Sequence, residues 1–233
     1  MMTTLVEFKS LSKSFNKKIL VDNISFKLKK GEITTLIGQN GVGKTTLAKI
    51  LLGQEKYNSG ELIIKPNIKI GYVPQKLDFG FNMPMTAKGL LKSLSPDGLD
   101  YDLIDLEEFI GYNKIKNKDI ALISGGELQK LLLTGTLMSK PDLLILDEPT
   151  QFLDVTSQQE FYQILRELKE KLSITIFMIS HDLFTVMKHT DQVVCINGHV
   201  CCIGKPTDLG TNPDLKNALS EIGVYIHNHD HKH

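Results

Sequence analysis

The chain has 233 residues, of which 41% are hydrophobic and 23% are charged, a composition typical of a water-soluble globular protein of one domain. Lys and Arg together number 27, as do Asp and Glu, so the formal charge of zero excludes a general attraction to nucleic acid or anionic lipid. The longest apolar runs are far shorter than the roughly 18 to 20 residues that cross a bilayer, so no membrane-spanning segment is predicted.

The N-terminus and the cysteines both indicate a cytoplasmic chain. The first ten residues contain Glu7 and no apolar block before a small-residue cleavage site, which does not resemble a signal peptide. The cysteines are Cys195, Cys201 and Cys202, and adjacent cysteines rarely form a sound disulfide. We therefore expect all three to be reduced packing residues.

The first predicted elements are antiparallel strands. Apolar and polar residues alternate over residues 5–8 and 24–28, which favours strands with one solvated face. Gly31 and Glu32 then turn the chain.

Four later apolar runs are unbroken and rich in β-branched residues, which is typical of strands buried on both faces of a parallel sheet. They cover residues 33–37, 143–146, 174–179 and 193–196. Between the second and third runs, apolar residues recur at helical spacing, at Phe161, Ile164, Leu165, Leu168 and Leu172. This pattern predicts a crossover helix and an α/β architecture.

Residues 76–140 carry a different pattern, which predicts a mostly helical insertion. Short helical patterns such as Leu103, Leu106 and Ile110 are separated there by turn residues, namely Pro84, Gly89, Pro96, Gly98 and Gly111. Residues 1–226 are then one domain, and residues 227–233 form a flexible tail with His at alternate positions. The tail either coordinates zinc loosely or is a solvated or tag-like segment.

A glycine-rich loop lies between the strand at 33–37 and a helical pattern that ends at Gly53, which is the context of a P-loop. The loop reads Gly38-Gln39-Asn40-Gly41-Val42-Gly43-Lys44-Thr45, followed by Thr46. In such a loop successive N–H groups surround a phosphate, Lys44 neutralises the β and γ oxygens, and the Thr45 hydroxyl ligates Mg²⁺. Arg166 is the one Arg of the chain, so phosphate binding must use Lys and backbone amides. The flanking strand and helix weaken the alternative of a chance match.

Two carboxylates follow the buried strand at 143–146. Asp147 and Glu148 lie where open parallel sheets place their ligands. Asp147 suits the magnesium shell, and Glu148 suits the general base or the group that orients the attacking water. The alternative is that one of the carboxylates only caps the turn at Pro149 and Thr150.

Two further positions have a structural and a functional interpretation. His181 follows the strand at 174–179, and it either contacts a γ-phosphate or is a packing or surface residue. Ser124 and Glu127 have the capping-box spacing, so they open a helix. Gly125 and Gly126 between them also expose backbone amides, which would make a second anion site.

Together these motifs resemble the ATP-binding subunit of ABC transporters. The order and spacing agree over residues 4 to about 210, and the motifs are the P-loop, Tyr72-Val73-Pro74-Gln75, Ile123-Ser124-Gly125-Gly126-Glu127, Leu146-Asp147-Glu148-Pro149-Thr150, Leu153-Asp154 and Ser180-His181-Asp182. The resemblance implies a P-loop NTPase fold with a central mostly parallel sheet, an N-terminal antiparallel β subdomain and an inserted helical subdomain. It makes Phe15 the aromatic residue that stacks on adenine, and Gln75 a glutamine near magnesium. Residues 124–127 become the signature, Asp154 the aspartate that faces a partner, and His181 the switch histidine.

A closer resemblance is to the ATPase subunit of bacterial high-affinity zinc uptake systems. It rests on Gly71-Tyr72-Val73-Pro74-Gln75-Lys76, Asp147-Glu148-Pro149-Thr150-Gln151, His181-Asp182-Leu183 with Val186-Met187, Cys201-Cys202, and the His-rich end after Gly223-Val224-Tyr225. The signature region departs from the common pattern at Ile123, Glu127, Lys130 and Gly135. These departures bear on catalytic rate and on the docking of the signature helix more than on ATP binding.

The resemblance also implies partners. Two copies would face head to tail, with ATP and Mg²⁺ between the P-loop of one and the signature of the other, at the cytoplasmic face of the cell membrane. Since the one Arg lies on the predicted crossover helix, N–H groups from a partner chain would supply the remaining transition-state charge. Membrane permease subunits would dock on an apolar groove at Phe79, Phe81 and residues 83–85. The alternative is that these residues form ordinary core of the helical subdomain. A periplasmic metal-binding protein would be an indirect partner, and no nucleic acid is expected.

Four other functions compete with this one. Soluble ABC ATPases of iron–sulfur assembly share the whole motif set, and importers of other metals such as manganese are near relatives. A GTPase does not fit, because Asn117-Lys118-Asp119 lacks the guanine-binding spacing. A binding module without turnover would lack Glu148 or His181, and both are present.

Overall fold

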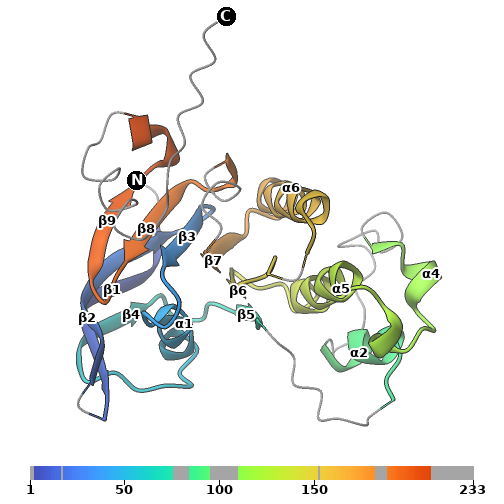
Figure 1. Cartoon of the computed structure of the whole chain (residues 1–233), viewed down its shortest axis with the longest axis horizontal. Helices are drawn as coiled ribbons and strands as arrows, with labels where there is room; N and C mark the ends of the chain where they lie inside the picture. The colour runs from blue at the N-terminus through green and yellow to red at the C-terminus, as the bar shows by residue number, and fades with distance from the viewer. Residues whose placement is uncertain are drawn as a thin grey trace, which may run out of the picture.

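The computed structural model describes residues 3–16, 18–75, 84–94, 110–151, 153–181 and 188–210. Figure 1 shows a β-rich part on the left, which contains β1, β2, β3, β8 and β9, and a helical part on the right, which contains α2, α4 and α5. This is the predicted α/β class, so the fold-class prediction is confirmed.

The N-terminal sheet has three strands in the order β2-β1-β4. β1 (Thr4–Phe15) pairs antiparallel with both β2 (Lys18–Lys29) and β4 (Ser59–Ile64). The alternating pattern thus correctly predicted β1 and β2. β4 had no prediction, because three of its first four residues are exposed and it offers only a weak apolar pattern.

The central sheet has six strands in the order β5-β6-β7-β3-β8-β9. Its strands are β3 (Ile33–Gly38), β5 (Ile70–Val73), β6 (Leu143–Asp147), β7 (Thr175–Ser180), β8 (Gln192–Ile196) and β9 (Val200–Gly204). All neighbours are parallel except β8 and β9. The four predicted runs are β3, β6, β7 and β8, although β3 and β7 also contain buried threonines, Thr34, Thr35 and Thr175.

The central strands are largely apolar because each of their faces lies in a different core; the buried Thr34 and Thr35 of β3 are hydrogen-bonded. In β6, Leu144 and Leu146 pack with the helices α2, α5 and α6, whereas Leu143 and Ile145 pack with α1 and the N-terminal sheet. Phe26 of β2 lies 5.9 Å from Phe177 of β7, between ring centroids, and so joins the two sheets. A strand in this position cannot alternate apolar and polar residues without burying the polar ones.

The described helices include the predicted crossover. α6 (Val155–Leu172) connects β6 to β7 and buries Phe161, Leu165 and Leu168, and α1 (Lys44–Leu51) follows the glycine-rich loop. Residues 84–94 and 110–140 contain α2 (Ala87–Leu94), α4 (Tyr112–Ile115), a short 3-10 turn η1 (Ile120–Leu122) and α5 (Gly125–Leu137). A second 3-10 turn, η2 (Pro206–Gly210), follows β9. Leu103, Leu106, Phe79, Phe81, Met83 and the tail at 227–233 lie outside the described residues.

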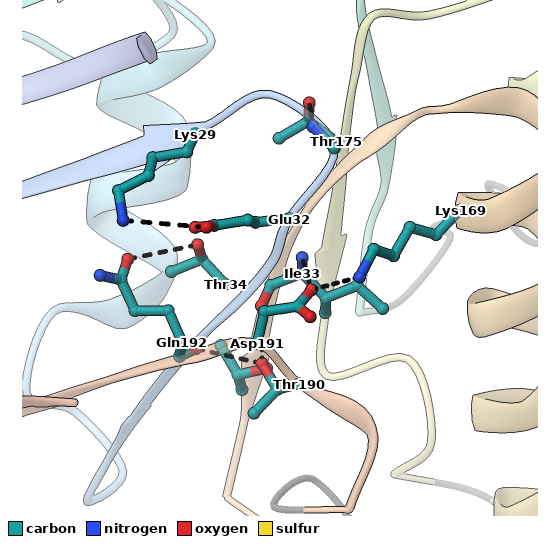
Figure 2. Close-up of polar contacts among 11 residues, drawn as sticks. Lys29, Glu32, Ile33, Thr34, Lys169, Thr175, Thr190, Asp191 and Gln192 are labelled. Carbon is teal, nitrogen blue, oxygen red and sulfur yellow. Dashed lines mark hydrogen bonds and ion pairs between the residues drawn. The ribbon is translucent and has the colours of Figure 1, made fainter. Parts of the chain in front are cut away.

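Polar contacts fix the start of β3, the strand that leads into the glycine-rich loop. The Ile33 amide donates to Asp191 Oδ2 over 2.7 Å, and Lys169 Nζ of α6 donates to the same oxygen over 2.6 Å. Thr190 Oγ1 donates to the Ile33 carbonyl over 2.8 Å. Figure 2 shows Lys169 and Asp191 pointing toward one another beside Ile33. β3 is thereby held by β8 and α6 at the edge of the sheet opposite the loop.

The prediction of three reduced cysteines is wrong for two of them. Cys195 and Cys202 form a disulfide, and Cys201 is the reduced cysteine of the described chain. The adjacency of Cys201 and Cys202 did not bear on this pair. Antiparallel pairing of β8 with β9 puts Cys195 directly opposite Cys202, with a Cα–Cα distance of 5.0 Å that a disulfide can bridge.

The structure explains one departure in the signature helix, the glycine at 135. A Cβ on Gly135 of α5 would lie 2.6 Å from Leu94 Cδ1 and 2.7 Å from Leu94 Cβ in α2. Glycine therefore lets α2 pack directly against α5. Lys130, another departure, lies on the same helix and pairs with Glu160 of α6 over 3.2 Å.

We predict that Gly135→Ala lowers the free energy of unfolding by about 1 kcal/mol, because crowding of about 1 to 3 kcal/mol exceeds the gain in helix propensity of about 1 kcal/mol. Urea denaturation measures this change. The control is Gly126→Ala in the same helix, whose Cβ would meet its nearest neighbour at 3.6 Å and should cost nothing. Equal stability of Gly135→Ala and the wild type would contradict the close packing of α2 on α5.

Candidate nucleotide-binding and catalytic site

The predicted site residues of the central sheet meet at one edge because their strands are parallel neighbours. In the pairing registers, Asp147 of β6 lies beside Ile179 of β7, and Ile37 of β3 lies beside Ser180. The residues that follow these strands, Gly38 onward, Glu148 and His181, therefore leave the sheet at the same edge. This is the edge at which open parallel sheets hold ligands.

A cavity of about 430 Å³ lies at this edge. The loop, the start of α1 and two neighbouring strand ends line it, through Leu20, Asn40, Gly41, Gly43, Lys44, Thr45, Thr46, Gln75 and Glu148. Gly43, the N-cap of α1, has a φ of 99°, and no side chain of the described chain caps this helix start. The first amide groups of α1 are thus left for a ligand, and the positive end of the helix dipole favours an anion.

The backbone of the loop depends on two of its glycines. A Cβ on Gly38 would lie 2.3 Å from the Ile196 carbonyl oxygen, and a Cβ on Gly43 would lie 2.5 Å from Val21 Cγ1. Because Gly43 also has a positive φ, a larger residue there would be strained as well as crowded. The loop can therefore lie against β8 and β2 only with glycine at these two positions.

Lys44 is the buried cation of the site. Its Nζ donates to the carbonyl oxygens of Gly38 and Gln39 over 2.8 and 3.0 Å and lies 3.7 Å from Glu148 Oε1. Burial lowers the pKa of Lys44, and the negative charges of Glu148 and Asp147 oppose that shift. The ammonium group lies beside the cavity, where it can pair with phosphate oxygens.

Asp147 is buried at the end of β6 among oxygen atoms. Thr45 Oγ1 donates to its Oδ1 over 3.2 Å, and Tyr72 OH donates to its Oδ2 over 3.5 Å. Burial raises the pKa of Asp147, and the hydrogen bond from Thr45 opposes that effect. Burial and the charge of Asp147 raise the pKa of Tyr72 to about 12, so the tyrosine stays a proton donor. A carboxylate and a hydroxyl at this distance match the oxygen ligands that Mg²⁺ prefers.

Glu148 and His181 are in direct contact. His181 Nδ1 lies 2.5 Å from Glu148 Oε2, and the other oxygen of Glu148 faces Lys44. The Glu148 side chain is 8% exposed, whereas that of His181 is 51% exposed. The partners of the Glu148 carboxylate are thus Lys44 and His181. In the described structure this carboxylate makes no hydrogen bond to Pro149 or Thr150. The turn at 148–151 is closed instead through the backbone, since the Gln151 amide donates to the Glu148 carbonyl.

Glu148 also has an unusual backbone. Its φ is 49°, in the left-handed region that non-glycine residues seldom adopt, and its amide donates to the Ile179 carbonyl over 3.0 Å. This conformation costs of order 1 kcal/mol and turns the chain sharply after β6. After this turn Glu148 lines the cavity, whereas Asp147, one residue earlier, contacts Thr45 of the loop.

Gln75 lies at the cavity, two residues beyond β5, and donates from Nε2 to Gln151 Oε1 over 2.6 Å. The sequence reasoning assigned no role to Gln151 or Tyr72, although both stand in the motifs that carried the resemblance. For Gln151 the available signal was its position directly after the Asp-Glu-Pro-Thr turn. Leu20, which lines the cavity, carried no sequence signal.

Several predicted residues do not line this cavity. Asp147 and His181 adjoin it through their contacts with Thr45 and Glu148, and the remaining ones lie elsewhere. Phe15 is 59% exposed, and Lys13 Nζ lies 5.3 Å from the centre of its ring. Ser124 caps α5, and Ser124 and Glu127 form the predicted capping box, while Asp154 caps α6 through the Ser157 amide. Leu153 Cδ2 lies 3.6 Å from where a Gly126 Cβ would be, so the start of α5 and the loop before α6 are neighbours.

Comparison with known proteins identifies the family. The ABC transporter family model matches residues 21–151, and the zinc import ATP-binding protein ZnuC of Rickettsia bellii is 53% identical over 229 residues, 98% of each chain. The chain belongs to the ABC transporter family. It is an ATPase of that family, as its resemblance predicted. The protein of the same name from Yersinia pseudotuberculosis is 37% identical over 238 residues, 100% of this chain and 94% of that one.

Solved ABC structures have the same fold. An ATP-binding subunit of an ABC transporter has a TM-score of 0.79 at 24% identity, covering 94% of this chain and 100% of that one. The cbiO1 protein of Clostridium perfringens, part of the transporter complex cbiONQ, has a TM-score of 0.77 at 24% identity, covering 94% and 95%. Among the described helices, none is long and apolar enough to cross a membrane.

Proposed function

We propose that this ABC ATPase drives the uptake of zinc through membrane permease subunits. The observation that carries the choice of zinc is the 53% identity to a zinc import ATP-binding protein over 98% of both chains, supported by 37% identity to a second one. The ATPase half of the proposal is supported independently by the arrangement of the site. Lys44 and Glu148 line the cavity, Asp147 contacts Thr45, and His181 contacts Glu148.

ATP binds, in this proposal, with its phosphates on the glycine-rich loop. The amides of residues 38–46 donate to the phosphate oxygens, and the Lys44 ammonium exchanges its carbonyl partners for the β and γ oxygens. Such a loop suits a polyphosphate, because among the described residues the hydrogen-bond and ion-pair partners of the Lys44 ammonium are two carbonyl oxygens and Glu148. Phe15, exposed on the adjacent sheet, stacks on the adenine ring.

Mg²⁺ accompanies the nucleotide and neutralises charge on its phosphates when bound. The donors that would hold it are the Thr45 hydroxyl, the Asp147 carboxylate and the Gln75 amide oxygen. Asp147 Oδ1 and Thr45 Oγ1 lie 3.2 Å apart, which supports a common ligand role. All three donors are oxygens, as a small divalent cation of this kind requires.

Glu148 is the general base in this proposal, and His181 keeps the Glu148 carboxylate in position. Glu148 Oε2 contacts His181 Nδ1, so the carboxylate is fixed where it can accept a proton from the attacking water. The His181 side chain is 51% exposed, and its other ring nitrogen, Nε2, approaches the γ-phosphate in this proposal.

A second copy of the chain completes the site. The signature residues Ser124, Gly125, Gly126 and Glu127 lie at the start of α5, with Asp154 nearby, and do not line the cavity of their own chain. Leu122 and Val155 beside them are 78% and 69% exposed, which supports a covered surface in the dimer. Permease subunits at the cytoplasmic face of the membrane and, indirectly, a periplasmic metal-binding protein are the remaining partners.

We predict that Glu148→Gln traps the ATP-bound dimer. Loss of the general base should lower ATP turnover by at least about 100-fold while binding continues. In size-exclusion chromatography with light scattering, the variant with ATP should have about twice the 26.1 kDa monomer mass. The double variant Lys44→Ala/Glu148→Gln, which lacks the phosphate cation, should stay monomeric; undiminished turnover by Glu148→Gln would contradict its role.

The choice of metal is tested by transport. Vesicles that contain the chain and the membrane subunits that co-purify with it should accumulate radioactive zinc when ATP is supplied, and Lys44→Ala should abolish accumulation. Stronger accumulation of manganese than of zinc would contradict the zinc assignment. Co-purification with iron–sulfur assembly proteins and no membrane subunit would contradict a transport role altogether.

A further inference from the structure

We propose that Gln151 is a positioning residue that decides which end of the Gln75 amide faces the metal. Gln75 Nε2 donates to Gln151 Oε1 over 2.6 Å, a short hydrogen bond between two side-chain amides. This inference rests on the proposed role of Gln75 and adds a residue that the resemblance left without one.

The two glutamines meet because their strands are neighbours. β5 and β6 are parallel, with Val73 beside Leu146, so the segment after each strand leaves the sheet at the same edge. Gln75 lies two residues beyond β5, and Gln151 lies four beyond β6. Their side chains therefore bridge adjacent strand ends, at the rim of the cavity that Gln75 lines.

The turn that carries Gln151 is held at both of its ends. The backbone amide of Gln151 donates to the Glu148 carbonyl over 3.3 Å, and the Thr150 carbonyl accepts from Gln158 Nε2 of α6 over 3.3 Å. The turn at 148–151 is thus attached to the helix that follows it. Among the described contacts, the bond to Gln151 is the one that the side chain of Gln75 makes. Gln151 is therefore the residue whose replacement would leave the Gln75 amide without this partner.

The chemistry of an amide makes the direction of this bond matter. A glutamine side chain has an NH₂ group at one end that only donates and an oxygen that only accepts. A divalent cation binds the oxygen and is repelled by the NH₂ group. Because Gln151 Oε1 takes the NH₂ group of Gln75, the Gln75 oxygen is the end left for the metal. Without an acceptor at 151, both orientations of the Gln75 amide become available.

Binding of Mn²⁺, a paramagnetic substitute for Mg²⁺, tests this inference without turnover. Electron paramagnetic resonance measures the affinity of the full chain for Mn²⁺ in the presence of a non-hydrolysable ATP analogue. Gln151→Met, which keeps the length and removes the acceptor, should weaken Mn²⁺ binding by about 3- to 10-fold, the effect of one hydrogen bond. Gln151→Glu keeps an acceptor oxygen and should bind Mn²⁺ at least as tightly as the wild type.

Matched variants separate positioning from a structural effect. Gln163→Met, on the outer face of α6 where Gln163 bonds Glu167, should leave Mn²⁺ affinity unchanged. In the absence of metal, all variants except those at Gln75 should bind the ATP analogue with the affinity of the wild type. In a Gln75→Ala background, Gln151→Met should cause no further loss, because the residue acts through Gln75.

Three outcomes distinguish an error in the role of Gln151 from an error in the proposed metal role of Gln75. If Gln75→Ala weakens Mn²⁺ binding and Gln151→Met does not, the positioning role is wrong and the metal role of Gln75 stands. If Gln151→Met weakens binding equally with and without Gln75, Gln151 acts by another route and the inference is also overturned. If Gln75→Ala leaves Mn²⁺ affinity unchanged, the metal role of Gln75 is wrong and the inference falls with it.

Discussion

The site is organised around one buried ammonium group. Lys44 is 6% exposed, and removal of such a group from water costs several kcal/mol unless negative or dipolar partners surround it. Two loop carbonyls and the Glu148 carboxylate are those partners. In the proposed mechanism a polyphosphate is a stronger partner for the same cation, and its arrival also frees Glu148 for the attacking water. The charge that stabilises the loop is therefore also the charge that selects the ligand.

The parallel sheet supplies everything else that this cation needs. Because β3, β6 and β7 are neighbours, the loop lies beside the paired carboxylates and His181 although more than a hundred residues separate it from them along the chain. The sheet can be largely apolar because each face packs into its own core, and the buried Thr34 and Thr35 of β3 are hydrogen-bonded. Figure 2 shows a cluster of polar contacts at the edge opposite the site. Rigid strands thus hold a polar site whose members contribute little packing of their own.

Much of this arrangement could be predicted from the sequence, for a physical reason in each case. Unbroken apolar runs revealed β3, β6, β7 and β8, since burial on both faces leaves no other composition. Carboxylates and histidine after such runs had to share an edge. By contrast, β4 and β5 are short or half exposed, and the Cys195–Cys202 disulfide depends on a strand register that residue spacing does not reveal. The Gln75–Gln151 contact likewise needs the order of strands in the sheet, which the chain order of its motifs does not give.

The most direct test of the account is calorimetric binding of ATP, ADP and AMP to the wild type and to Lys44→Ala. If the buried Lys44 ammonium contacts the β and γ phosphates, ATP and ADP should bind strongly and AMP weakly. Lys44→Ala should then lose about 10- to 100-fold in ATP affinity. AMP binding should hardly change. If Lys44→Ala bound ATP as tightly as the wild type does, the buried ammonium would not be the group on which nucleotide binding depends.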